Sequence, residues 1–172
     1  MKRQLQVAGF GLLVAVCVSL SAGAFVRAQM GDMNAGSNGA KPKAYVLYLA
    51  EPQTVPAGKS AVLDLRFRVV QGYHVNSHSP KSELLIPTAL SLDTAAGVKV
   101  GPLDYPAGQS YSFSFDPSEK LDVYAGDIIV KLPVVAAAGE HTIAGTLRYQ
   151  ACDNASCYPP KTLPVQVLFT AK

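Results

Sequence analysis

Two cysteines near the end of the chain are the side chains best suited to chemistry. Cys152 and Cys157 lie in the stretch YQACDNASCYPP, residues 149–160, with four residues between them. The remaining cysteine, Cys17, lies in an apolar run at the N-terminus. A closely spaced pair of thiols can form a structural disulfide, contribute to a metal site or exchange disulfides with other proteins. The elements that position the pair decide among these possibilities.

The N-terminus is typical of a secretory signal peptide. A short basic start precedes an apolar run from Val7 to Leu20, and small residues then lead to a cleavage site after Ala28. Cleavage after Ala24 is the alternative. We therefore expect residues 1–28 to be removed on export, and we expect the mature protein in an oxidising compartment.

Two other interpretations of this segment fit its residues less well. An uncleaved membrane anchor needs roughly 20 apolar residues, whereas the run here has about 14. A lipoprotein would carry its lipid on Cys17, but the bulky Val16 directly before it matches such a motif poorly. No other stretch of the sequence is apolar enough to cross a membrane.

The charge balance argues against a nucleic-acid partner. The chain has 15 Lys and Arg against 12 Asp and Glu, and Lys2, Arg3 and Arg27 leave with the signal peptide. The mature chain is therefore neutral and has no basic cluster that would bind a nucleic acid. It keeps an even number of cysteines, for which a disulfide is the default in an oxidising compartment.

Composition divides the mature chain into a linker and one domain. Residues 29–43, QMGDMNAGSNGAKPK, are rich in Gly, Asn and Ala and offer little to bury, so we expect a flexible linker. The remaining residues, 44–172, have the length of a single domain and show no internal repeat.

The domain has the pattern of a β protein. In AVLDLRFRV, residues 61–69, apolar positions alternate with Asp and Arg, which indicates a sheet with one wet face. Turns containing Pro and Gly separate the candidate strands, and no stretch holds a helical period for three turns. We predict an all-β fold, an antiparallel β-sandwich, with a small barrel as the alternative. The other candidate strands are residues 44–50, 88–93, 98–103, 111–115, 127–135, 141–150 and 163–169.

The two cysteines are expected to face one another at the ends of consecutive strands. Residues 143–152 and 157–169 form these strands, and the DNAS between them is turn-forming. Opposed residues of an antiparallel pair lie about 4.5–5.5 Å apart at Cα, a separation that a disulfide accepts. Such a short ring would stabilise the fold by only roughly 2 kcal/mol. A structural disulfide and a redox pair therefore both remain open.

A metal site is the third possibility for the thiols. His74 and His78 could join them to bind zinc or copper. These histidines are far from the cysteines in sequence, however, and an i,i+4 pair on a strand spans roughly 13 Å. Met30 and Met33 could bind copper, but they are better explained as ordinary linker residues. We therefore expect neither a metal nor another cofactor.

Hydrolytic chemistry has little support. Ser77, Ser79 and the three histidines form no nucleophile-elbow or paired-acid pattern. His141 follows an expected turn and is interpreted as a surface residue. We therefore expect no small-molecule substrate.

The stretch RYQACDNASCYPP resembles the active-site hairpin of a known family, the N-terminal periplasmic domain of the transmembrane thiol–disulfide reductase DsbD. The family pattern is Tyr-Gln-x-Cys, a short loop and Cys-Tyr-Pro-Pro, and Tyr149, Gln150 and Tyr158 agree with it as well as the cysteines. The segments VVQGYHVNSHSP, LLIPTALSL and DVYAGDIIVKLPV resemble earlier parts of the family sequence. The resemblance covers residues 44 to 170 and is strongest in the last third.

The resemblance implies an immunoglobulin-like sandwich with a redox role in the periplasm. In that family the domain takes electrons from a membrane partner and passes them through mixed disulfides to thioredoxin-like proteins, including one that serves cytochrome c biogenesis. By motif position, Cys157 is expected to bond to partners and Cys152 to resolve that bond.

The resemblance also implies a cap over the disulfide. The family covers its disulfide with a loop that bears an aromatic side chain, and that loop is expected here within residues 111–124, YSFSFDPSEKLDVY. Phe115 is the candidate cap and Phe113 is its rival, with ordinary core packing as the alternative for both. Tyr73 and Tyr149 are expected to flank the cysteines.

Two departures from the family pattern qualify these expectations. The loop between the cysteines is one residue shorter than in the best-known member, and the chain ends just after the sandwich, without the family's membrane and thioredoxin-like domains. We therefore expect a separate membrane thiol reductase as a partner. A non-catalytic sandwich that binds a protein, with the disulfide only pinning its hairpin, is the alternative function.

The residues around the cysteines predict thiols of ordinary acidity. Asp153 next to Cys152 disfavours a thiolate there, and the nearest cations in sequence, Arg148 and Lys161, are not adjacent to either cysteine. We therefore expect no strongly acidic thiol of the kind found in oxidases.

Overall fold

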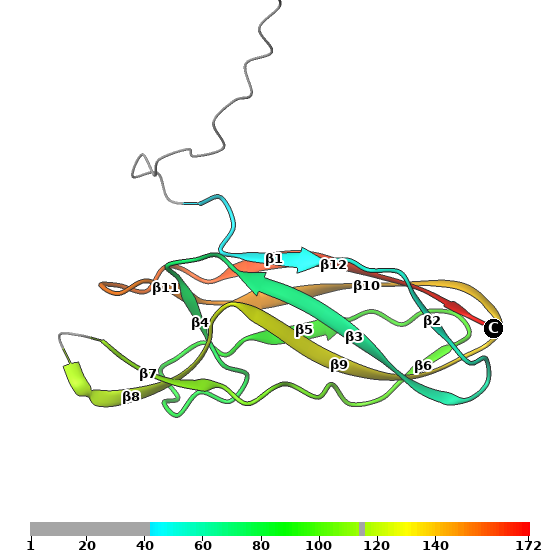
Figure 1. Cartoon of the computed structure of the whole chain (residues 1–172), viewed down its shortest axis with the longest axis horizontal. Helices are drawn as coiled ribbons and strands as arrows, with labels where there is room; N and C mark the ends of the chain where they lie inside the picture. Colours follow the sequence, from blue (N-terminus) through cyan, green and yellow to red (C-terminus); the bar gives the residue numbers. More distant parts are fainter. Residues whose placement is uncertain (1–41, 114–115) are drawn as a thin grey trace, which may run out of the picture. The chain divides into compact units, whose positions relative to one another are not determined.

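The computed structural model describes residues 42–113 and 116–172. Every regular element in these ranges is a strand, which confirms the predicted all-β fold (Figure 1). The same ranges contain no helix that could span a bilayer. The strands are β1 (Val46–Leu49), β2 (Gln53–Val55), β3 (Ser60–Val69), β4 (His74–Asn76), β5 (Ala89–Leu92), β6 (Val98–Val100), β7 (Gln109–Phe113), β8 (Asp116–Tyr124), β9 (Asp127–Ala136), β10 (Gly139–Tyr149), β11 (Ala151–Cys152) and β12 (Lys161–Ala171).

Two four-stranded sheets share one hydrophobic core. One sheet has the order β1-β3-β9-β6 and the other the order β2-β12-β10-β5. All neighbouring strands in them pair antiparallel except β2 and β12, which run parallel. Buried side chains from both sheets, such as Leu65 from β3 and Val167 from β12, belong to the same cluster. The predicted immunoglobulin-like sandwich is confirmed, and these sheets do not close into the alternative small barrel.

Strand β3 shows how the sequence pattern produces this arrangement. Leu63, Leu65 and Phe67 are buried in the core, whereas the residues between them point outward. Among the outward residues, Arg68 donates two hydrogen bonds to the carboxylate of Asp127 on β9, at 2.6 and 3.0 Å. One face of the sheet is therefore dry and the other wet, as the alternation predicts.

A third sheet, with the order β11-β4-β8-β7, lies where the cysteines are. Its members β4 and β8 are not among the strands predicted from periodicity, and β8 has the polar sequence DPSEKLDVY. Pairing with β7, with Tyr111 opposite Leu121, holds β8 in place. The cap loop expected within residues 111–124 is therefore mostly a two-stranded hairpin, the β7–β8 hairpin.

The predicted targeting segments stay predictions. The signal peptide, residues 1–28, lies outside the described residues, and so does the linker, residues 29–43, except for its last two positions.

Candidate functional site

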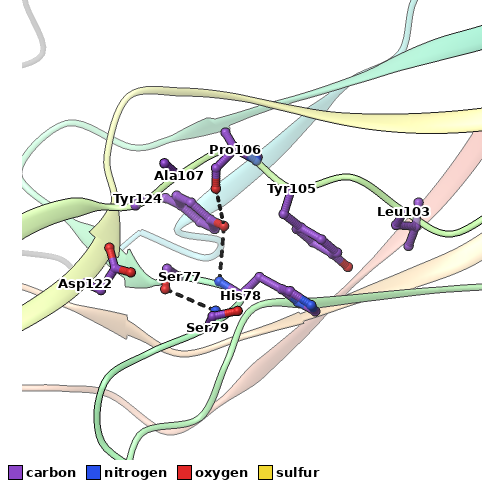
Figure 2. A pocket seen from close by; sticks show the side chains of 10 residues that line it. Ser77, His78, Ser79, Leu103, Tyr105, Pro106, Ala107, Asp122 and Tyr124 are labelled. Carbon is purple, nitrogen blue, oxygen red and sulfur yellow. Dashed lines mark hydrogen bonds between the residues drawn. The ribbon is translucent and has the colours of Figure 1, made fainter.

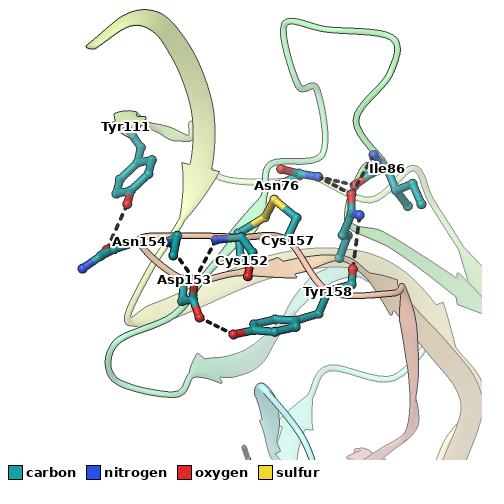
Figure 3. Close-up of a disulfide and its surroundings, with 11 residues drawn as sticks. Asn76, Ile86, Tyr111, Cys152, Asp153, Asn154, Cys157 and Tyr158 are labelled. Carbon is teal, nitrogen blue, oxygen red and sulfur yellow. Dashed lines mark hydrogen bonds between the residues drawn. A yellow bond between two sulfur atoms is a disulfide. The ribbon is translucent and has the colours of Figure 1, made fainter. Parts of the chain in front are cut away.

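Cys152 and Cys157 form a disulfide within the cysteine hairpin, residues 149–161 (Figure 3). β10 and β11 lead into this hairpin and β12 leads out of it. The Cα atoms of the two cysteines are 3.9 Å apart, closer than the about 4.5 Å of the tighter pairs in a regular antiparallel ladder. They are an isolated bridge beyond the end of the β10–β12 pairing, so the ladder does not set their spacing. The predicted facing of the two cysteines is confirmed.

Asp153 holds the loop between the cysteines in a tight turn. Its Oδ1 accepts hydrogen bonds from the backbone N–H groups of Ala155 and Ser156, both at 2.8 Å. Its backbone N–H donates to the carbonyl of Ser156 at 2.9 Å. Such bonds from a short acidic side chain to its own backbone are the reason Asp favours turns.

The second carboxylate oxygen of Asp153 accepts a hydrogen bond from the Tyr158 hydroxyl (Figure 3). This bond, followed by burial, raises the pKa of Tyr158 above its ordinary value. The phenol therefore remains a neutral donor at physiological pH and ties the residue after Cys157 back to the loop. The carboxylate of Asp153 therefore binds both the backbone of the loop and the Tyr158 hydroxyl.

The two cysteines differ in their exposure to solvent. Cys152 is 0% exposed and belongs to a small buried cluster with Phe113, Leu121 and Val123. Cys157 is exposed. A protein partner can therefore reach Cys157, whereas Cys152 is covered by the third sheet.

The β7–β8 hairpin covers Cys152. Phe113 packs in the cluster that contains this cysteine, and the Tyr111 hydroxyl donates to Oδ1 of Asn154, between the two cysteines, at 3.0 Å (Figure 3). The position of Phe113 is compatible with a cap and equally with core packing. Phe115, the first candidate for the cap, lies outside the described residues.

Tyrosines pack around the residue that follows Cys157. Tyr158 stacks on Tyr45 with ring centroids 5.1 Å apart, and Tyr73 lies 4.8 Å from Tyr45 and 6.1 Å from Tyr158. Tyr149 belongs to the same buried cluster as Tyr45 and Tyr158, and its hydroxyl accepts the backbone N–H of Tyr45 at 3.3 Å. Tyr45 was not predicted as a site residue because it is more than a hundred residues from Tyr149 and Tyr158 in the sequence.

Gln150 fastens the cysteine hairpin to the neighbouring segments. Its Oε1 accepts hydrogen bonds from Nδ2 of Asn76 at 3.2 Å and from the N–H of Ile86 at 3.5 Å. Its Nε2 donates to the carbonyl of Tyr158 at 3.2 Å. Asn76 also donates to the carbonyl of Ile86 at 2.9 Å. The Gln of the family motif therefore links the hairpin to β4 and to the loop after it.

Lys161, one of the two cations nearest to the cysteines in sequence, contacts residues other than the cysteines. Nζ of Lys161 donates to the carbonyl of Lys43 at 2.7 Å and lies 4.5 Å above the ring of Tyr45.

In the ranges that the structure describes, no group of three His, Cys, Asp or Glu side chains could hold a metal ion. His78 is occupied elsewhere, with Nδ1 3.0 Å from the carbonyl of Thr88.

His74 is a site residue that the sequence suggested only as a metal ligand and, with the other histidines, as a member of a hydrolytic site that found little support. It lies on β4 directly opposite Cys152 on β11, and it is buried. The signal that could have revealed it is a polar residue within the GYHVN segment, which resembles a family strand. Its pairing with the cysteine depends on strand contacts that sequence periodicity does not report.

Comparison with known families now decides the identity of the domain. Residues 47–168 match the family described as "Thiol:disulfide interchange protein DsbD, N-terminal". The chain belongs to this family. The match confirms the resemblance that was drawn from the cysteine hairpin motif. A comparison with curated proteins gave no match.

Three solved structures are similar to this member of the DsbD N-terminal family. The reduced N-terminal domain of DsbD from Neisseria meningitidis is 22% identical, with a TM-score of 0.41, over 63% of this chain and 81% of that one. A complex of the DsbD and PilB N-terminal domains from the same organism gives 21% identity and a TM-score of 0.46, over 75% and 87%. The N-terminal periplasmic domain of ScsB from Proteus mirabilis gives 11% and 0.48, over 70% and 49%. Because these scores are low, the family membership rests on the match over residues 47–168.

This DsbD N-terminal domain also has a hollow of about 300 Å³ away from the disulfide (Figure 2). The rings of His78 and Tyr105 stack there with centroids 3.7 Å apart. The Tyr124 hydroxyl accepts the N–H of His78 at 3.1 Å and donates to the carbonyl of Pro106 at 2.9 Å. Through Tyr124, these two bonds join the end of β8 to the segment after β4 and to the segment before β7.

Proposed function

We propose that the protein exchanges disulfides with thioredoxin-like proteins in the periplasm through the Cys152–Cys157 pair. The observation that supports this most directly is that the hairpin motif of the family contains an exposed Cys157 bonded to a fully buried Cys152. Exchange requires that a thiolate of one protein reach a sulfur of the other. The exposed cysteine meets that requirement.

The exchange has two steps in this proposal. The thiolate of reduced Cys157 attacks a disulfide of the partner and releases one partner thiolate, which forms a mixed disulfide. Cys152 then attacks the sulfur of Cys157, the bond to the partner breaks, and the partner leaves with its second thiolate. Two electrons have passed to the partner, and the Cys152–Cys157 disulfide is restored.

A separate membrane thiol reductase returns electrons by the same steps in the opposite sense. Export through the signal peptide, residues 1–28, puts the domain in the periplasm. The protein then acts as the protein-disulfide reductase component of a relay, including one that serves cytochrome c biogenesis. It uses no cofactor and takes no nucleic acid or small molecule as a substrate.

The β7–β8 hairpin controls access in this proposal. Phe113 or Phe115 acts as the aromatic cap, and the hairpin moves aside when a partner docks. The hydrogen bond from Tyr111 to Asn154 is at the surface, where an exposed bond contributes little stability and can break readily.

Trapping with a single cysteine variant tests the proposal. The chain carrying Cys17→Ser and Cys152→Ser, activated on Cys157 with Ellman's reagent, should form a mixed disulfide with a reduced thioredoxin whose second active-site cysteine is replaced by serine. This mixed disulfide should accumulate, because neither protein has a second thiol to resolve it, and dithiothreitol should cleave it. The matched chain with Cys17→Ser and Cys157→Ser should form none, because Cys152 is buried. If neither variant forms a mixed disulfide while both stay folded and bind a thioredoxin-like protein non-covalently, the alternative of a binding module with a structural disulfide is correct.

A further inference from the structure

His74 is the residue directly opposite the buried Cys152. β4 pairs antiparallel with β11, and the register matches His74 with Cys152 and Val75 with Ala151. Side chains of directly opposed residues share a face of the sheet, with Cβ atoms about 4.5–5.5 Å apart. The imidazole ring therefore lies on the same face as the Cys152 sulfur and within the reach of a side chain.

One nitrogen of this imidazole is buried without a partner. His74 is 4% exposed, and its Nε2 has no hydrogen-bond partner among the described residues. The ring packs against Tyr111, with ring centroids 4.0 Å apart, and lies 6.0 Å from the ring of Phe113. Buried polar atoms nearly always have partners, so this nitrogen requires an explanation. While the disulfide is closed Cys152 has no S–H, and reduction creates a donor beside the ring.

The surroundings of His74 favour a neutral ring that can accept a proton. The titratable groups that face it from the neighbouring elements are Cys152, Tyr111 on β7 and Asp153 in the hairpin loop. β8 contributes only an apolar side chain to the hollow of about 220 Å³ that His74 lines. Burial lowers the pKa of His74, and the carboxylate of Asp153 opposes this effect more weakly. The same carboxylate favours the imidazolium once a proton arrives.

We propose that His74 accepts the thiol proton of Cys152 when that cysteine attacks the mixed disulfide on Cys157, an inference that rests on the exchange function proposed above. The S–H bond of Cys152 breaks and its proton goes to Nε2 of His74. The resulting thiolate forms a bond to the sulfur of Cys157, and the bond from Cys157 to the partner sulfur breaks. The partner leaves as a thiolate and takes a proton from solvent, and the imidazolium later returns its proton to solvent.

This assignment gives the buried cysteine a base that the sequence around it lacks. A thiol of ordinary pKa is only a few per cent ionised at neutral pH, and burial in apolar surroundings reduces that fraction further. An adjacent imidazole lets the proton leave at the moment of attack, as in other cysteine–histidine pairs. In the opposite direction the imidazolium protonates the Cys152 thiolate as the disulfide opens.

The reaction with Ellman's reagent isolates this step without a protein partner. In the reduced chain carrying Cys17→Ser, Cys157 attacks the reagent and releases one thionitrobenzoate, and Cys152 then displaces a second one from Cys157. The second release measures the proposed step. His74→Gln should slow it about tenfold at pH 7, because only the ordinary ionisation of the thiol remains. The difference should shrink steadily as the pH rises above about 8.5, because a growing fraction of the thiol then ionises without help.

The pH profile separates a proton acceptor from a structural role. A structural role of His74 would slow the second release equally at every pH, and this outcome, or an unchanged rate at pH 7, would overturn the proposal. His141→Gln is the matched control, because its ring lies on Phe169 with Nε2 2.7 Å from the carbonyl of Ala137. This control should leave both releases unchanged.

A measurement on the unsubstituted histidine covers the case in which His74→Gln does not fold. The imidazole protons of His74, followed by NMR, should titrate at a lower pH in the dithiol form than in the disulfide form, because an S–H donated to Nε2 stabilises the neutral ring. Identical titrations in the two forms would refute the coupling between the ring and Cys152.

The results with Ellman's reagent and with thioredoxin can fail independently. If His74→Gln slows the second release in a pH-dependent way but Cys157 forms no mixed disulfide with thioredoxin, the exchange function fails and the assignment of His74 stands. If Cys157 forms the mixed disulfide and His74→Gln does not slow the second release in a pH-dependent way, only the assignment of His74 fails.

Discussion

Cys152 is fully buried, whereas Cys157, the cysteine to which it is bonded, is exposed. The difference arises because Cys152 ends β11 and pairs with β4 inside the third sheet, while Cys157 follows the loop and pairs only with Cys152 itself. Cys157 can therefore contact another protein, whereas the folded protein lets Cys152 react only within the chain.

The exposure of the two sulfurs predicts unequal alkylation after reduction. Iodoacetamide should modify Cys157 at least about tenfold faster than Cys152, because the buried thiol reacts only when the third sheet opens. Mass spectrometry of peptides from a time course measures both rates. In denaturant the two rates should become similar, and equal rates in the folded protein would contradict the structure.

The exchange function predicts a reduction potential in the range of exchanging thiol proteins. Equilibration of the Cys152–Cys157 pair with glutathione or dithiothreitol should give a value between about −180 and −270 mV. A value well below about −300 mV is typical of a structural disulfide. Such a result would favour the binding module over the relay.

The hydrogen bonds of Gln150 predict a measurable contribution to stability. Gln150→Ala leaves Asn76 and the N–H of Ile86 without their shared acceptor, and we expect the free energy of unfolding in urea to fall by about 1–3 kcal/mol. Gln166→Ala on the exposed side of β12 is the matched control and should change it by less than about 0.5 kcal/mol. Equal effects of the two substitutions would mean that the network does not hold the hairpin.

The buried His74 predicts a loss of stability in mild acid. Burial lowers its pKa in the folded state, so the unfolded chain binds a proton more readily, and the stability that this group contributes is present above the unfolded pKa. It should be lost as the pH falls from about 6.5 toward the folded pKa, by at most about 1.4 kcal/mol per pH unit.

Urea unfolding between pH 7.5 and pH 5 measures this loss. His74→Gln should remove most of the dependence on pH in this interval, and His141→Gln should retain it. If His74→Gln shows the same slope as the unsubstituted protein, another group is responsible for the acid sensitivity.

Much of the sandwich could be predicted because its information is local. The alternation in β3 specifies a strand with one buried face, and the DNAS turn between two apolar runs specifies a hairpin that brings Cys152 opposite Cys157. Each of these signals lies within about ten residues, the range over which strand periodicity and turn chemistry act. Strand β8 was not predicted because its polar sequence lacks the alternation of apolar residues that indicates a strand. Its strand conformation depends on pairing with β7.

By itself, the sequence determined the β-sandwich, the pairing of the two cysteines and, through the hairpin motif, the family of the chain. Only the tertiary structure decided that Cys152 is covered while Cys157 is not, that His74 stands opposite the covered sulfur, and that Tyr45 stacks on Tyr158. The physical reason is that burial and cross-strand contact depend on segments brought together by folding. His74 and Cys152 are far apart in the sequence and are neighbours only because β4 pairs with β11, so no local pattern predicts their contact.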